Sequence, residues 1–257
     1  MIPRKIHIIW IQGLNAMPDE NIALVRSLWK NNPSYKVFLW DNNRISRLLK
    51  HLYPDLFHIY SSVNELTGHV STFTSMSDIA RYAILRTYGG VYLDMDFRGV
   101  KSIDDVLNRY PGSSFIAADN RYKIFETYPE LARMVPFKPI YCACFFACEE
   151  DHPVWDQVFS RVRRATSRDE IGMALDKELQ KRTDVTIIAN NVVATHASCS
   201  TNSMISSPSQ SSWFLGRQMF VMMSCHPYVT MCVLLILSMV TIVLICYMVS
   251  YLLKKVS

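Results

Sequence analysis

Two aspartates set one residue apart, Asp94 and Asp96, are the side chains of this 257-residue chain whose spacing best suits a chemical role. They follow an apolar run that begins at Val91, so they stand at the end of an expected β-strand. Residues i and i+2 of a strand point to the same side, with Cα atoms roughly 6.5 Å apart, so their carboxylates can converge on one ion. Carboxylate oxygens suit Mg²⁺ or Mn²⁺, which keep positions open for water and diphosphate oxygens. The pair therefore predicts a divalent metal that holds a diphosphate.

A helix must position this strand. In residues 77–88 the apolar residues recur at helical spacing, which predicts a helix with Ser77 as its N-cap and Gly89 as its stop. Asp78 and Arg81 lie three residues apart and so share one face of this helix. After the two glycines the apolar residues recur at every second position, so successive side chains of the strand point to opposite sides. One side holds Val91, Leu93, Met95 and Phe97, and the other holds Tyr92, Asp94 and Asp96.

Two blocks of this sequence resemble glycosyltransferase family 32. The family's sugar-binding region is matched by Ser77-Asp-Ile-Ala-Arg-Tyr82 followed by Gly89-Gly-Val-Tyr-Leu-Asp-Met-Asp96. Its N-terminal signature is matched by residues 2–10, which end in Ile-Ile-Trp, and by the later Leu39-Trp-Asp41. The resemblance is good over residues 2–110 and extends more distantly to the clostridial glucosylating toxins. It implies an α/β fold of the GT-A type, a Rossmann-like mixed sheet flanked by helices that binds a nucleotide sugar.

The same resemblance implies roles for individual residues. Asp94 would contact the metal and the sugar or ribose, and Asp96 would be the more direct metal ligand. Asp78 and Arg81 would hold hydroxyls of the donor sugar, with Arg81 also near the diphosphate. Tyr92 would be among the donor contacts.

Further site residues are expected near both ends of the catalytic domain. Trp10, at the end of the first strand, would stack on the nucleotide base through an exposed ring face. His196 resembles the family's closing histidine and would be a third metal ligand, with a surface loop histidine as the alternative. Ser212 and Trp213 would donate to the leaving diphosphate. In the family these elements lie closer together than here, where a Ser-rich stretch separates them.

The expected reaction moves a hexose from GDP-mannose or a UDP-hexose, with retention of configuration, to a glycan or lipid acceptor such as inositol phosphoceramide. Mn²⁺ or Mg²⁺ and cationic side chains would stabilise the negative charge that grows on the departing diphosphate. Same-face attack by the acceptor is favoured over a covalent carboxylate intermediate, because the metal occupies the aspartate pair. Both routes stay open at this point.

Two other classes of protein compete with a transferase. A phosphohydrolase would use the first aspartate as a nucleophile, but Phe97-Arg98 does not supply the Thr or Val that such enzymes carry near the pair. A non-catalytic nucleotide-sugar-binding membrane protein stays open, because the family's Gly-Pro at a helix start reads Gly172-Met173 here. A nucleic-acid partner is not expected, since no aromatic residues interleave the arginines of residues 161–168.

Residues 228–253 contain no charged side chain and can cross roughly 30 Å of hydrocarbon as a helix. They predict a C-terminal transmembrane helix. The expected domains are a GT-A domain at 1–197, a linker and juxtamembrane segment at 198–227, the anchor at 228–253 and a tail at 254–257. The orientation is open. A first strand with no preceding signal peptide favours a cytosolic domain, whereas Lys254 and Lys255 and the Golgi or endoplasmic reticulum location typical of eukaryotic relatives favour a lumenal one.

The remaining pattern predicts the rest of the α/β unit. Strands are expected at 36–40, 114–118, 141–147 and 186–189, and helices at 21–30, 155–164 and 171–181. Alternation along the 141–147 strand would point Cys142, Cys144 and Cys148 to one face, and seven cysteines give no disulfide framework. His7, inside the first strand, is expected to be a structural residue.

Overall fold

The computed structural model describes residues 1–95, 102–119, 141–188, 193–194, 205–206, 235 and 238–244. The described residues up to 206 belong to one compact unit, and residues 235 and 238–244 belong to a second. Among all these residues, no helix combines the length and the apolar character that a membrane crossing needs. Most of the predicted 228–253 anchor lies outside the described residues, as do Asp96, His196, Ser212 and Trp213.

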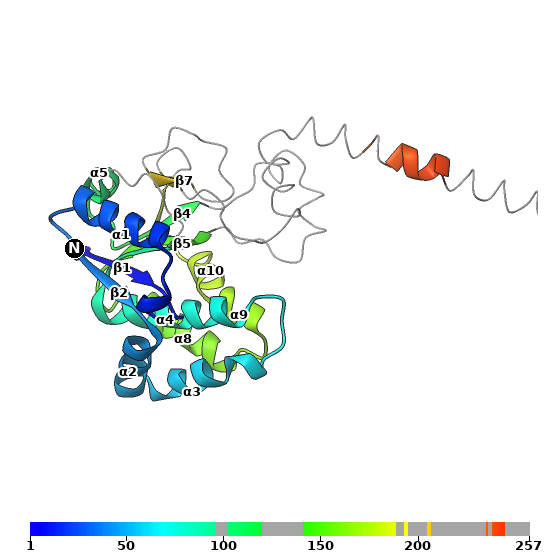
Figure 1. The fold of residues 1–257 in the computed structure, drawn as a ribbon, viewed down its shortest axis with the longest axis horizontal. Coiled ribbons are helices and arrows are strands. Elements are labelled where there is room, and N and C mark those ends of the chain that lie inside the picture. The colour runs from blue at the N-terminus through cyan, green and yellow to red at the C-terminus, as the bar shows by residue number, and fades with distance from the viewer. Residues whose placement is uncertain are drawn as a thin grey trace, which may run out of the picture. The chain divides into compact units, whose positions relative to one another are not determined.

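The first unit is built around a six-stranded mixed sheet with the order β2-β1-β3-β5-β4-β6 (Figure 1). β5 runs antiparallel to β3 and β4, whereas the β1–β2, β1–β3 and β4–β6 pairs are parallel. The strands are β1 Lys5–Ile9, β2 Lys36–Trp40, β3 Gly90–Leu93, β4 Phe115–Asp119, β5 Tyr141–Cys148 and β6 Val185–Ile188. A separate parallel pair is formed by β7 Val193–Ala194 and β8 Ile205–Ser206. The expected α/β architecture with a mixed sheet is confirmed.

Helices cover both faces of the large sheet. One face buries Trp40, Tyr92 and Phe146 under α2, α3, α4, α8, α9 and α10. The opposite face buries Ile8, Val91 and Leu93 under α1 and α5. The helices are α1 Asp19–Asn31, α2 Asn42–Leu52, α3 Pro54–Ser62, α4 Thr72–Tyr88, α5 Ile103–Leu107, α8 Val154–Arg164, α9 Arg168–Gly172 and α10 Ala174–Leu179, with 3-10 turns at Leu14–Ala16 and Val63–Glu65.

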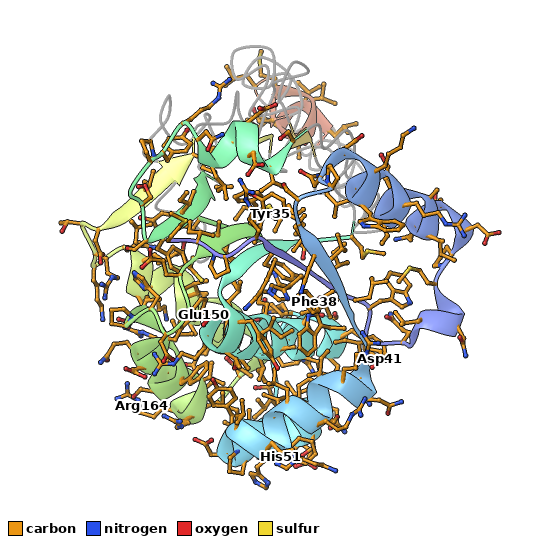
Figure 2. All side chains as sticks on the ribbon, turned by 90° about the vertical axis from the view of Figure 1, so that its left-hand side faces the viewer. Tyr35, Phe38, Asp41, His51, Glu150 and Arg164 are labelled. Carbon is orange, nitrogen blue, oxygen red and sulfur yellow. A yellow bond between two sulfur atoms is a disulfide. The ribbon has the colours of Figure 1, made fainter. Side chains whose placement is uncertain are left out.

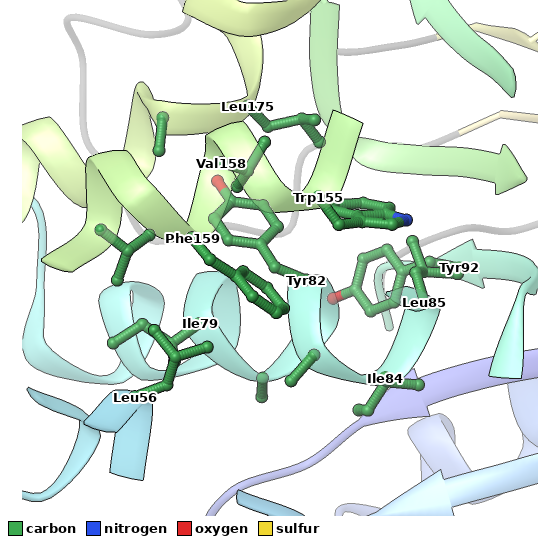
Figure 3. Packing of buried hydrophobic residues seen from close by; sticks show 14 of the residues in the cluster. Leu56, Ile79, Tyr82, Ile84, Leu85, Tyr92, Trp155, Val158, Phe159 and Leu175 are labelled. Carbon is green, nitrogen blue, oxygen red and sulfur yellow. The ribbon is translucent and has the colours of Figure 1, made fainter. Parts of the chain in front are cut away.

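Helix α4 lies at the centre of the larger core cluster. Its segment from Asp78 to Leu85 is buried on every side, which is unusual for a helix that also carries charged residues. Tyr82 packs against Trp155 of α8 with ring centroids 6.0 Å apart, and Tyr92 of β3 lies beside them (Figure 3). This packing fixes α4 against the sheet.

The helices differ from the sequence-based expectation in three places. α4 begins at Thr72, because Ser71 and not Ser77 is the N-cap: its hydroxyl accepts the Thr74 N–H at 3.1 Å. Helices α2 and α3 were not expected, although Asp41 caps α2 by accepting the Arg44 N–H. The helix expected at 171–181 is two short helices, α9 and α10, that meet at Met173.

The turn from α4 to β3 consists of two glycines. Gly89 and Gly90 have φ values of +53° and +92°, which residues with a side chain rarely adopt. A Cβ on Gly90 would lie 2.6 Å from the Lys5 carbonyl oxygen of β1. The backbone conformation therefore favours glycine at both positions, and the close approach of β1 also requires it at Gly90.

The cysteines of β5 do not share one face as expected. Cys142 and Cys144 form a disulfide and lie in the smaller core cluster, whereas Cys148 is a free thiol in the larger one. The pairing with β4 shifts register between Ala117 and Asp119, so the alternation of β5 is interrupted. Strict alternation fails wherever a strand carries such a bulge.

His7 is a structural residue, as expected. Its Nδ1 accepts the Trp40 indole N–H at 3.1 Å, so Nε2 carries the proton and donates to the Gly89 carbonyl at 2.9 Å. Burial lowers the pKa of His7 to about 4; the bond to Gly89 opposes the change and Lys5 adds to it. The neutral ring thus joins β1, β2 and the glycine turn.

We expect Gly90→Ala to destabilise the protein more than Gly112→Ala. Both glycines have a positive φ, but a Cβ on Gly112 meets nothing within 4 Å. The control should lose about 1 to 2 kcal/mol from backbone strain, and Gly90→Ala at least about 2 kcal/mol more from the clash with β1. Urea unfolding measures both. Equal losses would show that β1 does not constrain this turn.

We also expect His7 to make folding sensitive to acid. The unfolded chain binds a proton near the usual histidine pKa of about 6.5, whereas folded His7 resists it until about 4. The free energy of unfolding is therefore complete above about pH 6.5 and falls by up to roughly 3 kcal/mol as the pH drops toward 4. His7→Gln, which cannot titrate, should flatten this part of the curve. An unchanged slope would contradict the assignment.

Candidate functional site

The candidate site lies at the carboxyl end of the parallel strands. β1 is flanked by β2 on one side and β3 on the other, so the chain passes from β1 to β2 in one direction and then from β2 across to β3 in the other. Ligands of open α/β sheets bind in the crevice outside the strands at such a switch point. Trp10 follows β1, Asp41 follows β2 and Asp94 follows β3.

Arg81 of α4 is the centre of the site. Its guanidinium Nη2 lies 3.4 Å from Asp78 Oδ1 and its Nη1 lies 3.5 Å from Asp94 Oδ1. Nε donates to the Ser77 carbonyl at 3.2 Å, and Nη1 also donates to the carbonyl of Ala143 in β5. Arg81 is only 4% exposed, so these partners replace the water that a charged guanidinium would otherwise hold.

Tyr92 links the cation to Asp94. The Arg81 guanidinium carbon lies 4.6 Å from the centre of the Tyr92 ring, a cation–π distance. The Tyr92 hydroxyl donates to Asp94 Oδ1 at 2.6 Å. Burial raises the pKa of Tyr92 well above its usual value, so the hydroxyl remains a donor. Asp94 is therefore held through one carboxylate oxygen by both Tyr92 and Arg81.

The two carboxyl groups differ in environment. Burial raises the pKa of Asp78 to about 6, although Arg81 opposes the rise, and the carboxylate of Asp94 adds to it. Burial acts against the charge of Arg81, but Tyr92, Asp94 and Asp78 outweigh it and raise its pKa. Asp94 is 30% exposed, whereas Asp78 is buried. Asp94 is therefore the more accessible of the two carboxyl groups.

Trp10 follows β1, the strand that pairs with β3. Its backbone N–H donates to the Trp40 carbonyl at 2.8 Å, which extends the β1–β2 ladder. Its side chain is half-buried, and its indole Nε1 is a buried donor without a hydrogen-bond partner in the described part of the chain. Such unsatisfied donors are rare in folded proteins.

Helix α9 closes the other side of Asp78. A Cβ on Gly172 would lie 3.4 Å from Asp78 Oδ2, which is van der Waals contact, so α9 approaches Asp78 closely. Asp169 of α9 accepts the N–H groups of His69 and Val70, and Arg168 donates to the Gly68 carbonyl. The loop before α4 is thus fixed to α9.

The structure brings together four of the predicted site residues: Asp78, Arg81, Tyr92 and Asp94. Tyr92 and Asp94 face the same side of β3, as the alternation predicts, because Val91 and Leu93 enter the opposite core. The placement of Asp96, His196, Ser212 and Trp213 lies outside the described residues. Within the described ranges no group of three or more acidic, histidine or cysteine side chains is arranged for a metal. Sequence reasoning missed the Ala143 carbonyl, because that contact uses only the backbone of Ala143. It also did not predict that Gly172 approaches Asp78.

The comparisons with known proteins agree with this site. The family described as the glycosyltransferase sugar-binding region containing a DXD motif matches residues 18–113, which include Asp78, Arg81 and Asp94. An uncharacterized glycosyltransferase of Acanthamoeba polyphaga mimivirus is 32% identical over 163 residues, 63% of this chain and 56% of that protein. Inositol phosphoceramide mannosyltransferase 3 of Schizosaccharomyces pombe is 29% identical over 110 residues, 43% of this chain and 28% of that protein.

Among solved structures, the galactosyltransferase LgtC aligns over 86% of this chain and 95% of its own, with a TM-score of 0.47 and 12% identity. The chain spans little more than half the length of the mimivirus relative and a smaller part of the yeast one. The resemblance expected from the two sequence blocks is confirmed: residues 18–113 match the family of glycosyltransferase sugar-binding regions that contain a DXD motif.

Proposed function

We propose that this protein is a metal-dependent, retaining glycosyltransferase that moves a hexose from a nucleotide sugar to a glycan or lipid acceptor. One observation carries the proposal. Inside the family's sugar-binding region, the buried Arg81 joins Asp78 to Asp94 and leaves Asp94 partly exposed at the switch point of the sheet. Buried ionic groups in a cleft are typical of functional sites.

The charges of this group favour a divalent cation. With both carboxyl groups ionised, Asp78, Arg81 and Asp94 sum to one negative charge. Asp94 Oδ1 is used by Tyr92 and Arg81, while Oδ2 has no partner among the described residues. An oxygen ligand of this kind fits Mn²⁺ or Mg²⁺. We propose Asp94 and Asp96 as ligands, with His196 as a third.

The residues of this chain would act mainly by binding and orienting the donor. Arg81 holds Asp94 in place and adds positive charge near the expected diphosphate. Asp78 and Arg81 would accept and donate hydrogen bonds to sugar hydroxyls, and Trp10 would stack on the base. Ser212 and Trp213 would donate to the leaving diphosphate. A bound metal would supply Lewis-acid stabilisation of that leaving group.

The route of retention and the substrates are part of the proposal. We favour attack by the acceptor on the same face as the departing phosphate, because the proposed metal would occupy Asp94 and Asp96. GDP-mannose and UDP-hexoses are the proposed donors. A lipid acceptor, such as inositol phosphoceramide, is supported by the name of the yeast relatives and by the apolar residues 228–253. That segment would anchor the protein to a Golgi or endoplasmic reticulum membrane.

Product analysis separates the three candidate functions. With Mn²⁺ and a nucleotide sugar, a transferase releases nucleoside diphosphate, a phosphohydrolase releases phosphate, and a non-catalytic binding protein releases neither. The sequence after the aspartate pair argues against a phosphohydrolase, because Phe97-Arg98 lacks the Thr or Val that such enzymes carry there. We expect nucleoside diphosphate as the product.

We expect Asp94→Asn to abolish most of this turnover. The substitution keeps the shape but removes the negative charge that faces the metal, so release of nucleoside diphosphate should fall on the order of 10²-fold or more. Asp41→Asn is the matched control, because Asp41 is also a carboxylate at the end of a parallel strand but only caps α2. The control should lose no more than about 1 kcal/mol of stability and keep its turnover. Equal activity losses in the two variants would contradict a specific role for Asp94.

We expect the right donor to raise the melting temperature only when Mn²⁺ is present. A ligand at 100 times its Kd adds about 2.7 kcal/mol to the stability of the folded state. Thermal melting with GDP-mannose and UDP-hexoses measures this shift, and Arg81→Lys should reduce it, because lysine cannot contact both carboxylates and Ala143 at once. A full donor panel that leaves the melting curve unchanged in the presence of Mn²⁺ would count against the transferase.

A further inference from the structure

β2 is an edge strand whose outer side is open. Its one partner in the described sheet is β1. The Lys36 N–H donates to the Arg4 carbonyl, and the Trp40 carbonyl accepts the Trp10 N–H, so both residues direct their backbone groups toward β1. Along a strand of a parallel pair, the backbone N–H and C=O groups of one residue point toward the partner strand and those of the next residue point away from it. Val37 and Leu39 therefore direct their N–H and C=O groups outward.

Most of these outward groups are free to pair. The Leu39 carbonyl accepts from the Arg44 guanidinium at 2.8 Å. The Val37 N–H, the Val37 carbonyl and the Leu39 N–H have no hydrogen-bond partner in the described part of the chain. Unpaired groups of this kind are a template for an added strand.

A groove lies on each side of β2. The first has a volume of about 510 Å³ and is lined by residues 36–39 together with Val25, Arg26 and Trp29 of α1. The second has a volume of about 560 Å³ and lies between Phe38 and the α2 residues Arg44, Arg47 and His51, with Tyr88 beside them. Figure 2 views the molecule from this side, with Phe38 on β2, Asp41 just after it and His51 on α2. Side chains that alternate along an added strand would enter the two grooves in turn.

Both grooves are basic and have apolar rims. Arg26 and Lys36 line the first and Arg44, Arg47 and His51 line the second, and neither has an acidic lining residue among those described. Arg26, Lys36 and Arg47 form no ion pair with any described residue. Trp29 is 64% exposed and Leu52, on the rim of the second groove, is 52% exposed. Free cations beside exposed apolar side chains suit an acidic partner with apolar residues.

We propose that the outer edge of β2 binds an extended acidic peptide segment of a partner protein by strand addition. The backbone of the peptide pairs with Val37 and Leu39, its apolar side chains enter the two grooves, and its carboxylates meet the arginines. Backbone pairing gives affinity in this binding mode, and the pockets for alternate side chains give specificity. The site is separate from the Asp94 site and does not depend on glycosyl transfer.

Two other occupants fit the surface less well. A second copy of this chain would bring the same basic grooves together, so like charges would oppose the pairing. A flat anionic membrane would meet the arginines but would leave the backbone groups of Val37 and Leu39 unpaired. The peptide is the partner that uses the grooves, the charges and the backbone groups together.

Selection of a phage-displayed library of random linear peptides on the immobilised full chain tests this proposal. We expect enrichment of sequences in which acidic residues flank apolar residues at alternate positions. Fluorescence anisotropy with the best synthetic peptide should show about tenfold weaker binding to Val37→Pro, which removes one outward donor. Val37→Ala is the matched control, because it keeps the backbone N–H, and should bind within about twofold of the wild type. Arg47→Glu should weaken binding and reduce its salt dependence.

A scan of the peptide on the wild-type protein tests the backbone pairing even if Val37→Pro misfolds. N-methylation should weaken binding at every second peptide position, because only alternate N–H groups face β2. Loss of binding without this alternation would overturn the proposal, as would a selection that enriches no acidic sequence. Vesicles of phosphatidylcholine with phosphatidylserine form the last arm. If they bind the full chain better than phosphatidylcholine alone, Arg47→Glu removes this preference and no peptide is enriched, the surface binds membranes instead.

Discussion

The buried charge of Arg81 is the constraint on which the rest of the site depends. A guanidinium that is 4% exposed has lost its water and must find replacements within the protein. Those replacements come from three elements: Asp78 and Ser77 of α4, Tyr92 and Asp94 at β3, and the Ala143 carbonyl of β5. Removing any partner leaves a poorly compensated cation in the interior, so α4, β3 and β5 must keep their relative positions.

The fold holds these positions through short connections. The turn at Gly89 and Gly90 joins the end of α4 directly to the start of β3, and the close approach of Lys5 leaves no room for a side chain at Gly90. His7 ties the same turn to Trp40 of β2. The bulge in β5 precedes the segment that pairs regularly with β3, and Ala143 lies on its irregular side. Rigid elements, more than loops, therefore set the distance between Asp78 and Asp94.

The sequence predicted the relations within α4 and within β3 better than the contacts between these elements and the rest of the fold. Alternation placed Tyr92 and Asp94 on one side of β3, and helical spacing placed Asp78 beside Arg81, because both relations are local. The start of α4 differs from the prediction because Ser71 and Ser77 are both possible caps, and the structure uses Ser71. The bulge of β5 depends on pairing with β4, and the approach of Gly172 to Asp78 joins segments far apart in the chain. Interactions of this kind leave no local pattern to detect.

The local charge also bears on the order in which ligands bind. Taken alone, Asp78, Arg81 and Asp94 carry a net negative charge, so the site repels a nucleotide diphosphate even though the whole chain has a net charge of +5. A divalent cation at Asp94 would reverse the sign and turn repulsion into attraction. Protonation of Asp78, whose pKa is raised to about 6, would only neutralise the group. If Asp94 binds a metal as proposed, the metal must therefore arrive before the donor or together with it, and the donor depends on that cation for its affinity.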